Sequence, residues 1–494
     1  MGSPTVYRRA GIEAKGIGMK TRIIFSLFFI LIFILSSCGQ ETTTLLPMTQ
    51  TPVAAQPLMD IPTRTPIPFP TVQPSPTAVP LYPTASVVKA NVVAFIGRDN
   101  SNSLDTSLWV ANVDGSGERK LVEIAYNDKD GWTNNPLLQW SPDGKWISYI
   151  KSHVLYIIPP DGSIKRKLLP LPDTREIFMY RWSPDSSKIA YLETVGGKST
   201  VTPTPGPDNG MAPYLVGVID IATGNVSELS SFEANAGIPI LLWSPNGRDL
   251  LFIKDYSLVL LEVATRKVVK TIKRGCGLER GLSWSPNGRW FSYTDNGVGG
   301  FTPTWICVNS VTGGLIHTIQ VDSTSFNPIW DKTGNYLYFL ASKIDLARKL
   351  DPLIDERLMR YDARTQKTES LLSLKEQQQP NRYIRSLSIS PDGNTLMLQS
   401  GSSQTKLDMV FVDTQSLKST KLTLDLTDLK LPLIAPFNYY DLQTAWSPDS
   451  QNLILLAGNY GSFYMLNIKT GKATIFSGKH SVASWAVSPI ATTP

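Results

Sequence analysis

The stretch LLQWSPDGKWISY, residues 137–149, contains two short runs of alternating apolar and polar residues separated by Ser-Pro-Asp-Gly. Alternation with a period of two predicts β-strands, and Pro followed by Asp-Gly is typical of a tight turn. Pro142 fixes φ for the second position of a type I turn, Ser141 can bond back to the main chain, and Gly144 can adopt the left-handed conformation. The stretch therefore predicts a strand-turn-strand unit, and folding alone explains its motif.

The same Trp-Ser-Pro-Asp/Asn motif recurs along the chain. Each full copy joins a first strand to a second, and two more apolar runs follow before the next copy. A unit of four strands repeated every roughly 40 to 60 residues is typical of a β-propeller blade. Clear copies begin at Trp140, Trp182, Trp243, Trp284 and Trp446, and weaker ones occupy residues 330–334, 389–393 and 487–489. The copies at Trp182 and Trp446 carry Ser where the turn favours Gly, at a modest backbone cost.

The two ends of the repeat region complement each other. Residues 92–123 have the pattern of the second, third and fourth strands of a blade that lacks its first strand. Residues 481–487 have the pattern of a first strand that is not followed by the other three. Pairing them leaves no open sheet at the ends of the ring. We therefore predict an all-β fold over residues 88–490, an eight-bladed β-propeller of four-stranded antiparallel blades closed by the N- and C-terminal strands. Seven blades is the alternative if the degenerate unit at Trp330 packs irregularly.

These repeats resemble the WD-repeat-like propeller repeats of the TolB type, which are also seen in the propeller domains of prolyl-oligopeptidase-like peptidases. The resemblance rests on the Trp-Ser-Pro-Asp-Gly-Lys pattern and covers roughly residues 88–489. It implies a propeller, but such propellers host unrelated activities, so it implies little about function. TolB itself typically has fewer blades and a separate N-terminal domain. Because this chain departs on both points, TolB's partners are not carried over to it.

The amino-terminal region has the pattern of a secretory leader. Lys20 and Arg22 precede an almost wholly apolar run at residues 23–35, and small residues follow. Such a run is too short for an ordinary membrane-spanning helix and fits a signal peptide. Leu-Ser-Ser-Cys at residues 35–38 resembles the bacterial lipobox, which implies that Cys38 is lipidated and becomes the mature N-terminus. The alternative is an uncleaved anchor with an incidental cysteine.

These features divide the chain into three predicted parts. Residues 1–37 are a lipoprotein signal peptide, with residues 1–18 as an upstream extension. Residues 38–87 are the lipidated cysteine and a disordered tether, because Pro and Thr dominate residues 41–85 and cannot build a core. Its threonines are candidates for O-glycosylation, with a plain spacer as the alternative. Cleavage removes five Lys or Arg and one Glu, so the formal charge falls from +6 to about +2 and a nucleic-acid role loses support.

Motifs for catalysis and metal binding are sparse in the propeller region. The sequence holds no Gly-x-Ser-x-Gly elbow and no hydrolase-sized segment after the repeats, which argues against a complete serine peptidase. His153, His317 and His480 are far apart, and no His or Cys spacing fits a metal site, so we expect no metal and no cofactor. Cys276 and Cys307 fall in the same predicted blade and could form a disulfide in an exported protein. Two separate small buried residues are the alternative.

Long connections concentrate on one predicted face of the ring. In a four-stranded blade, the second-to-third loops and the blade-to-blade connections share one face, and the short turns share the other. Long loops on a rigid scaffold usually carry binding, so we assign the recognition surface to this long-loop face. The segment 342–356 is expected to include a short helix interrupted by Pro352. The long segments are residues 126–136, 196–212, 296–304, 342–356, 375–385 and 427–441.

Candidate contact residues stand just before the predicted innermost strands on this face. Arg and aromatic side chains suit anchoring contacts at the mouth of the ring. A solvated loop residue is the alternative for each of them. The candidates are Trp132, Arg175, Glu176, Glu279, Arg280, Arg382, Tyr383, Arg385, Tyr439, Tyr440, Asp441 and His480.

Three functions are compatible with this pattern. The favoured hypothesis is a monomeric, non-enzymatic protein of the cell surface or envelope, held at the membrane by its lipid only, whose propeller binds an envelope or extracellular protein, peptide or glycan. The second is an enzyme that cleaves glycans or peptides with Glu176, Glu279 or Asp441 as acid and base. The third is a scaffold within a multiprotein envelope complex, which would expose a large apolar patch. No nucleic acid is expected as a partner.

Overall fold

The structure of the protein is a computed structural model, and the residues that it describes form β-strands and turns. Within them, no helix is long and apolar enough to cross a membrane. The predicted signal peptide (residues 1–37) and tether (residues 38–87) lie outside the described residues and stay predictions. The described residues are 92–98, 106–124, 138–151, 154–169, 175–195, 211–235, 240–254, 257–273, 278–296, 304–312, 314–321, 328–344, 353–374, 384–401, 406–425, 442–457, 463–477 and 482–487.

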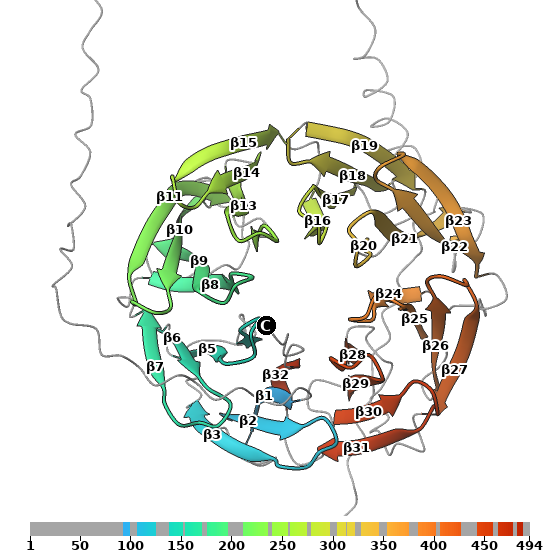
Figure 1. The fold of residues 1–494 in the computed structure, drawn as a ribbon, viewed down its shortest axis with the longest axis horizontal. Helices are drawn as coiled ribbons and strands as arrows, with labels where there is room; N and C mark the ends of the chain where they lie inside the picture. Colours follow the sequence, from blue (N-terminus) through green and yellow to red (C-terminus); the bar gives the residue numbers. More distant parts are fainter. Residues whose placement is uncertain are drawn as a thin grey trace, which may run out of the picture. The chain divides into compact units, whose positions relative to one another are not determined.

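The strands form eight antiparallel sheets of four strands, arranged in a ring as the blades of a propeller (Figure 1). In order from the centre outwards, blade 1 contains β32 (Val482–Val487), β1 (Val92–Arg98), β2 (Thr106–Asn112) and β3 (Arg119–Ile124). In the same order, blade 2 contains β4 (Gln139–Trp140), β5 (Ile147–Lys151), β6 (Val154–Ile158) and β7 (Arg166–Leu169). Blade 3 contains β8 (Arg175–Trp182), β9 (Lys188–Val195), β10 (Met211–Asp220) and β11 (Val226–Asn235).

The remaining blades repeat this order. Blade 4 contains β12 (Leu241–Trp243), β13 (Asp249–Lys254), β14 (Ser257–Glu262) and β15 (Lys267–Lys273), and blade 5 contains β16 (Leu278–Trp284), β17 (Trp290–Asn296), β18 (Thr304–Ser310) and β19 (Gly314–Val321). Blade 6 contains β20 (Ile329–Trp330), β21 (Tyr336–Ile344), β22 (Leu353–Asp362) and β23 (Lys367–Ser373). Blade 7 contains β24 (Ile384–Ile389), β25 (Thr395–Gly401), β26 (Lys406–Asp413) and β27 (Ser419–Asp425), and blade 8 contains β28 (Leu442–Trp446), β29 (Asn452–Ala457), β30 (Phe463–Asn467) and β31 (Ala473–Ser477).

The ring closes where the sequence predicts. β32 pairs antiparallel with β1, and Phe95 lies opposite Trp485. The degenerate unit at Trp330 is a regular blade, because the carboxylate of Asp331 takes the place of the motif serine and accepts the Tyr336 N–H at 2.8 Å. Both observations confirm eight blades and exclude the alternative of seven.

The Ser-Pro-Asp-Gly turn is held by a repeated set of hydrogen bonds. In the blade 2 turn, the N–H groups of Gly144 and Trp146 donate to the carbonyl and the Oγ of Ser141, each at 2.9 Å. Ser141 Oγ donates to Asp143 Oδ1 at 2.7 Å, and Gly144 has the left-handed φ of 70° that the turn requires. The same three bonds recur at Ser183, Ser244, Ser285, Ser390 and Ser447.

Two turns carry Ser in the left-handed position, and both serines link neighbouring blades. Ser186 and Ser450 have φ values of 61° and 59°. Their Oγ atoms accept the N–H groups of Asp143 and Asp392 in the turns of the preceding blades, at 2.9 and 3.0 Å. A hydrogen bond between turns therefore offsets the backbone cost that the sequence predicts at these positions.

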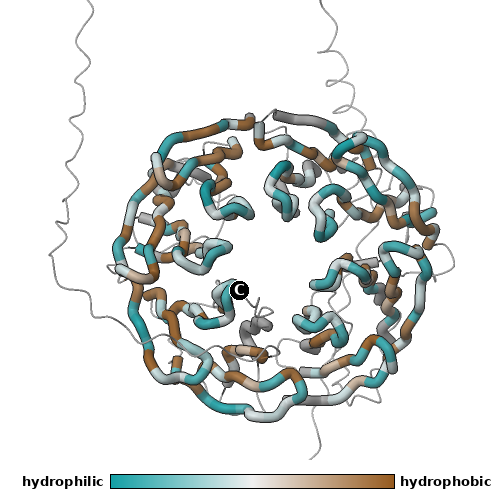
Figure 2. The backbone as a smooth tube through the Cα atoms, viewed as in Figure 1, coloured by the Kyte–Doolittle hydropathy of each residue, from teal (hydrophilic) through white to brown (hydrophobic). Residues whose placement is uncertain are grey.

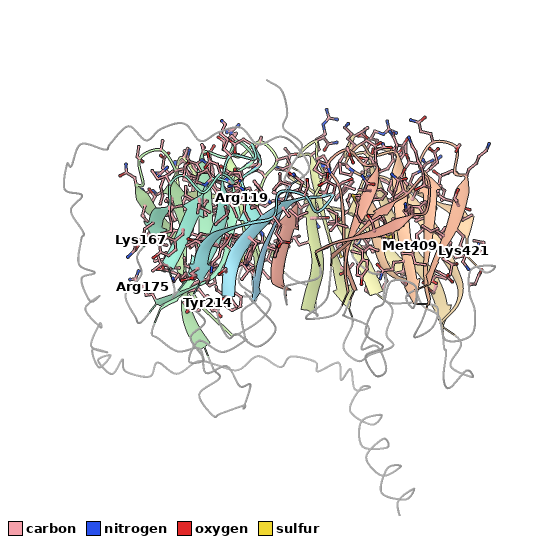
Figure 3. The ribbon with its side chains drawn as sticks, turned by 90° about the horizontal axis from the view of Figure 1, so that it is seen from below. Arg119, Lys167, Arg175, Tyr214, Met409 and Lys421 are labelled. Atoms are coloured by element: carbon pink, nitrogen blue, oxygen red, sulfur yellow. The ribbon has the colours of Figure 1, made fainter. Side chains whose placement is uncertain are left out.

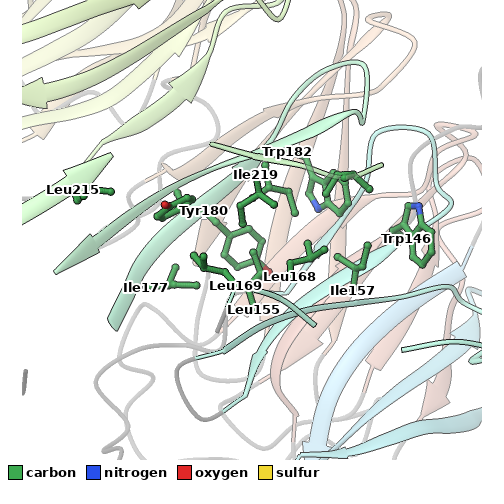
Figure 4. Close-up of a cluster of buried hydrophobic side chains, with 13 residues drawn as sticks. Trp146, Leu155, Ile157, Leu168, Leu169, Ile177, Tyr180, Trp182, Leu215 and Ile219 are labelled. Carbon is green, nitrogen blue, oxygen red and sulfur yellow. The ribbon is translucent and has the colours of Figure 1, made fainter. Parts of the chain in front are cut away.

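Apolar clusters fill the seams between blades, and Figure 2 shows apolar residues alternating with polar ones along the strands. The seam between blades 2 and 3 buries thirteen side chains, among them Trp182 and Tyr180 (Figure 4). Trp182 Nε1 donates to Ser148 Oγ of blade 2 at 2.8 Å, and Trp446 Nε1 donates to Ser388 Oγ of blade 7 at 3.0 Å. These motif tryptophans therefore pack between blades, as their period predicts.

Candidate functional site

The two faces of the ring differ in their connections. The Ser-Pro-Asp turns and the third-to-fourth turns share the short-turn face, and the second-to-third loops and blade-to-blade connections leave the strands at the opposite, long-loop face. Most of the long segments lie outside the described residues. At the blade 6 loop, β21 runs to Ile344 and pairs there with Leu353 of β22, so these two residues extend the sheet instead of forming the expected helix. This correction shortens the predicted loop at both ends.

The predicted contact residues are described to different extents. Arg175 is the one whose side chain the structure describes. Glu176, Glu279, Arg280 and Arg385 lie in the innermost strands β8, β16 and β24, at or near their long-loop ends, without described side chains. The remaining candidates lie outside the described residues: Trp132, Arg382, Tyr383, Tyr439, Tyr440, Asp441 and His480. Whether these residues come together therefore stays a prediction.

The predicted disulfide has one partner among the described residues. Cys307 lies in β18, the third strand of blade 5, and its side chain is buried in the seam with blade 4. Cys276 lies outside the described residues, so the pairing stays a prediction. Among the described side chains, no three His, Cys, Asp or Glu residues come together in a way that could hold a metal ion.

Arg175 is fixed by a buried carboxylate at the long-loop end of blade 3. It begins β8, the innermost strand, and its Nη1 donates to Glu193 Oε1 at 2.8 Å. The side chain of Arg175 is 28% exposed, whereas that of Glu193 is 1% exposed. Figure 3 shows Arg175 and Tyr214 toward one edge of the ring and Arg119 toward the other. The ion pair therefore orients a partly accessible guanidinium on the face assigned to recognition.

The buried carboxylate is only half satisfied. Glu193 Oε2 has no hydrogen-bond partner among the described residues. Burial raises the pKa of Glu193, while the positive charge and the hydrogen bond of Arg175 oppose this shift and the like charge of Glu228 adds to it. Such a group is costly to bury and depends on its one partner, so the conformation of Arg175 and the charge of Glu193 are coupled.

An aromatic side chain packs beside this pair on the same face of β9. Tyr191 and Glu193 are two residues apart, so both point toward the seam with blade 2. The ring of Tyr191 lies over Gly217, where an added Cβ would come within 2.3 Å of the hydroxyl oxygen. Burial raises the pKa of Tyr191, which keeps the hydroxyl protonated. Gly217 therefore makes room for the tyrosine under the ion pair.

This arrangement suits recognition better than catalysis. A guanidinium offers planar donors that match carboxylates, and Arg is common at the centre of binding surfaces. Glu193, whose pKa is raised by burial, has almost no exposed surface and could not reach a substrate in this conformation. What the described part of the face offers is a positioned cation.

The repeat pattern points to Arg175, close to the start of an innermost strand, but it does not point to Glu193, the partner of Arg175. The signal for Glu193 was present in the alternation of β9, where Ile189, Tyr191 and Glu193 share one face. A glutamate that continues an otherwise apolar face must find a cation or lose its charge. Arg175 opens the strand that pairs with this end of β9.

Two curated relatives match short parts of the chain, and no family model matches it. A protein assigned as a dipeptidyl aminopeptidase from Schizosaccharomyces pombe is 32% identical over 15% of this chain and 11% of its own length. A protein assigned as the C-terminal subunit of a Tricorn-like protease from Sulfurisphaera tokodaii is 30% identical over 23% of this chain and 12% of its own. The chain thus spans a small part of the length of these relatives.

Solved structures resemble the chain in fold. A eukaryotic initiation factor structure matches with a TM-score of 0.51 at 14% identity, covering 82% of this chain and 100% of that one. The dihydro-heme d1 dehydrogenase NirN matches with a TM-score of 0.50 at 12% identity, covering 84% and 78%. A protein from Agrobacterium tumefaciens assigned as TolB matches with a TM-score of 0.29 at 17% identity, covering 58% and 90%, which is too low to support an argument. At these identities the likeness shows a shared propeller fold and nothing of function.

Proposed function

We propose that the chain is a lipid-anchored, extracytoplasmic β-propeller of the cell envelope that acts as a non-enzymatic binding or scaffold module for a protein, peptide or glycan. The observation that carries the proposal is the asymmetry of the ring. One face consists of short turns that are held by hydrogen bonds within each turn. The strands at the other face lead into long connections, and Arg175 is held there by its ion pair. A rigid scaffold with variable loops on one face is a common design for binding.

Affinity purification of the tagged full chain from native membranes, followed by mass spectrometry, tests the binding function. We expect a reproducible partner that is lost when Arg382 and Tyr440 are both replaced by Ala, and weakened by Arg175→Ala. Lys367→Ala, on the outer strand of blade 6, is the control that should retain the partner. Retention of the partner by the double variant would remove Arg382 and Tyr440 from the site.

The lipid anchor is tested separately. Metabolic labelling with a radioactive fatty acid should label the wild-type chain, and Cys38→Ala should abolish the label and release the protein from the membrane fraction. A chain that stays unlabelled but membrane-bound would support the uncleaved anchor instead.

A peptide-cleaving enzyme is the second candidate, because both curated relatives are assigned as peptidases. The matched parts are small, and they leave most of those proteins without a counterpart in this chain. The enzyme hypothesis requires that the full chain cleaves a peptide library and that Glu176→Gln, Glu279→Gln or Asp441→Asn abolishes cleavage. We expect no cleavage by the wild-type chain.

A further inference from the structure

The outermost strands share an irregularity that the sequence motif does not reveal. In every blade except blade 7, the pairing of the third and fourth strands shifts by one residue, which inserts an extra residue into the fourth strand. A β-bulge of this kind bends the strand and redirects the inserted side chain. The inserted residues are all apolar: Leu121, Leu168, Leu229, Val269, Ile316, Leu371 and Phe476.

One of the inserted side chains is left uncovered. Of the five that the structure describes, the four leucines lie in or against the apolar clusters between blades. Val269 of blade 4 belongs to no such cluster and is 55% exposed, as is its neighbour Val268. Valine is shorter than leucine and does not reach the seam with blade 5. The outer strand of blade 4 therefore presents two adjacent valines to solvent.

The next blade adds a third exposed apolar group along the same seam, toward its long-loop end, whereas the valines lie nearer the short-turn end. Trp305 in β18 of blade 5 is 36% exposed. It lies two residues before Cys307, so both side chains point toward blade 4, where Cys307 joins the apolar cluster. Of the four large apolar side chains that are exposed among the described residues, three are Val268, Val269 and Trp305.

This strand is also strongly basic. Residues 266–274, Arg-Lys-Val-Val-Lys-Thr-Ile-Lys-Arg, contain five Lys or Arg and no Asp or Glu. Lys267 is exposed, whereas Lys270 Nζ donates to the Ser310 carbonyl of blade 5 at 2.8 Å and so ties the strand to the neighbouring blade. β15 is the edge of its sheet, and its outer side has no paired strand among the described residues.

We propose that β15 is a docking site for an extended acidic segment of a partner protein, which adds to blade 4 as a fifth strand. The free edge supplies main-chain donors and acceptors, as in other complexes formed by strand addition. The valines supply apolar contacts near the short-turn end of the added strand, and Trp305 supplies one near its long-loop end. The basic run selects an acidic strand by charge complementarity. This surface lies on the rim of the ring and is separate from the long-loop face.

Lysines also protect exposed sheet edges from aggregation, which is the competing explanation. A purely protective edge would gain nothing from two half-exposed valines in its centre. The two explanations differ in a measurable way, because a protective edge rejects every added strand, whereas a docking edge accepts an acidic one.

The probe for this test is a short fluorescein-labelled peptide of alternating Glu and Val, titrated with the full chain and followed by fluorescence anisotropy. We expect saturable binding that weakens as the ionic strength rises toward ~1 M, and protection of residues 267–273 from amide hydrogen exchange. Lys267→Glu should lower the affinity about tenfold, because repulsion replaces attraction beside the bound strand. Replacing Val268 and Val269 by Ser should lower it by about tenfold as well.

Blade 6 offers a matched control. Lys367 begins β23 opposite Asp362, as Lys267 begins β15 opposite Glu262, but the inserted Leu371 of blade 6 packs against the core. Lys367→Glu should leave peptide binding unchanged. The proposal is overturned if the peptide does not bind, if both charge reversals weaken binding equally, or if anionic phospholipid vesicles bind in a Lys267-dependent way while the peptide does not. The same variants also distinguish this site from the proposed function. If Lys267→Glu abolishes peptide binding but the full chain still co-purifies with its envelope partner, the two sites are independent.

Discussion

The seam between blades 2 and 3 and the seam between blades 4 and 5 contain the same motif tryptophan, yet they differ in how their polar groups are satisfied. In the first, Ser148 receives the Trp182 Nε1–H on its hydroxyl and the Tyr180 hydroxyl on its carbonyl. In the second, Leu251 occupies the position of Ser148 in its blade, and Trp284 Nε1 has no partner among the described residues. The motif therefore dictates that blades pack, and residues outside it decide how well.

The two seams should differ most in the free energy of unfolding that is lost when Trp182 or Trp284 is replaced by Ala. Trp182→Ala should lower the free energy of unfolding by about 3–5 kcal/mol, because it removes a buried indole and leaves the Ser148 hydroxyl without its donor. Trp284→Ala should cost about 1–2 kcal/mol less, since its Nε1–H makes no bond that could be lost. Urea unfolding of the full chain, followed by circular dichroism, measures both.

Replacing each tryptophan by Phe separates the contribution of the indole hydrogen bond from that of the buried aromatic ring. Trp182→Phe should remain destabilising by about 1 kcal/mol or more, whereas Trp284→Phe should be nearly neutral, because it deletes a buried donor without a partner. Equal costs at the two positions would contradict the comparison between the seams.

In the seam between blades 4 and 5, replacing a buried amide should increase stability instead of lowering it. Asn309 is fully buried, and neither its Oδ1 nor its Nδ2 has a hydrogen-bond partner among the described residues. Asn309→Leu, which keeps the branched shape and the number of side-chain heavy atoms and removes the unsatisfied groups, should raise the free energy of unfolding by about 1–3 kcal/mol. The matched change Ser148→Ala should lower it, since both partners of Ser148 Oγ would be lost. Destabilisation by Asn309→Leu would show that the amide is satisfied after all.

The fold was open to prediction because its information is local and repeated. Each Trp-Ser-Pro-Asp turn specifies two strands and their connection, so counting turns counts blades, and the incomplete units at residues 92–123 and 481–487 specify how the ring closes. The recurring bulge could not be predicted in this way. In the sequence, an inserted residue such as Val269 cannot be distinguished from any other apolar residue in a short strand. The pairing register depends on both strands, so the alternation of apolar and polar residues in one strand does not reveal it.

The candidate site was predictable only in outline. The repeat predicts Arg175 just before an innermost strand, and the structure places it as the first residue of that strand, β8. Its bond to Glu193 depends on which residues of β8 and β9 face each other. Position along a repeat shows which face a loop leaves from. It does not show which side chains meet across a bulge, and the register of β8 and β9 contains one between Ile177 and Met179.

A smaller loss of stability is expected at the blade 3 turn, where the side chain of Ser186 bonds to the neighbouring turn of blade 2. Ser186→Ala keeps the left-handed backbone with φ near 61° and loses the bond from the Asp143 N–H, so it should cost about 1 kcal/mol. Ser186→Gly loses the same bond but relieves the backbone, so it should be less costly than the Ala variant. Thermal unfolding of the two variants measures this order. An Ala variant as stable as the wild type would mean that the hydroxyl contributes nothing to the seam, and an Ala variant more stable than the Gly variant would mean that the left-handed backbone carries no cost here.

The smallest effect concerns Glu193, whose Oε2 has no hydrogen-bond partner among the described residues. Burial raises the pKa of Glu193 in the folded protein above its ordinary value near 4.5, so as the pH falls from 7 to 5 the folded state takes up a proton before the unfolded state does. Protonation of Glu193 therefore stabilises the fold in this range, and that contribution is lost as the pH rises again through the folded pKa. Glu193→Gln cannot take up this proton, so the stability of the wild type relative to this variant should increase between pH 7 and pH 5. A constant difference, measured by urea unfolding at both pH values, would mean that Arg175 satisfies the charge of Glu193 fully in the folded protein.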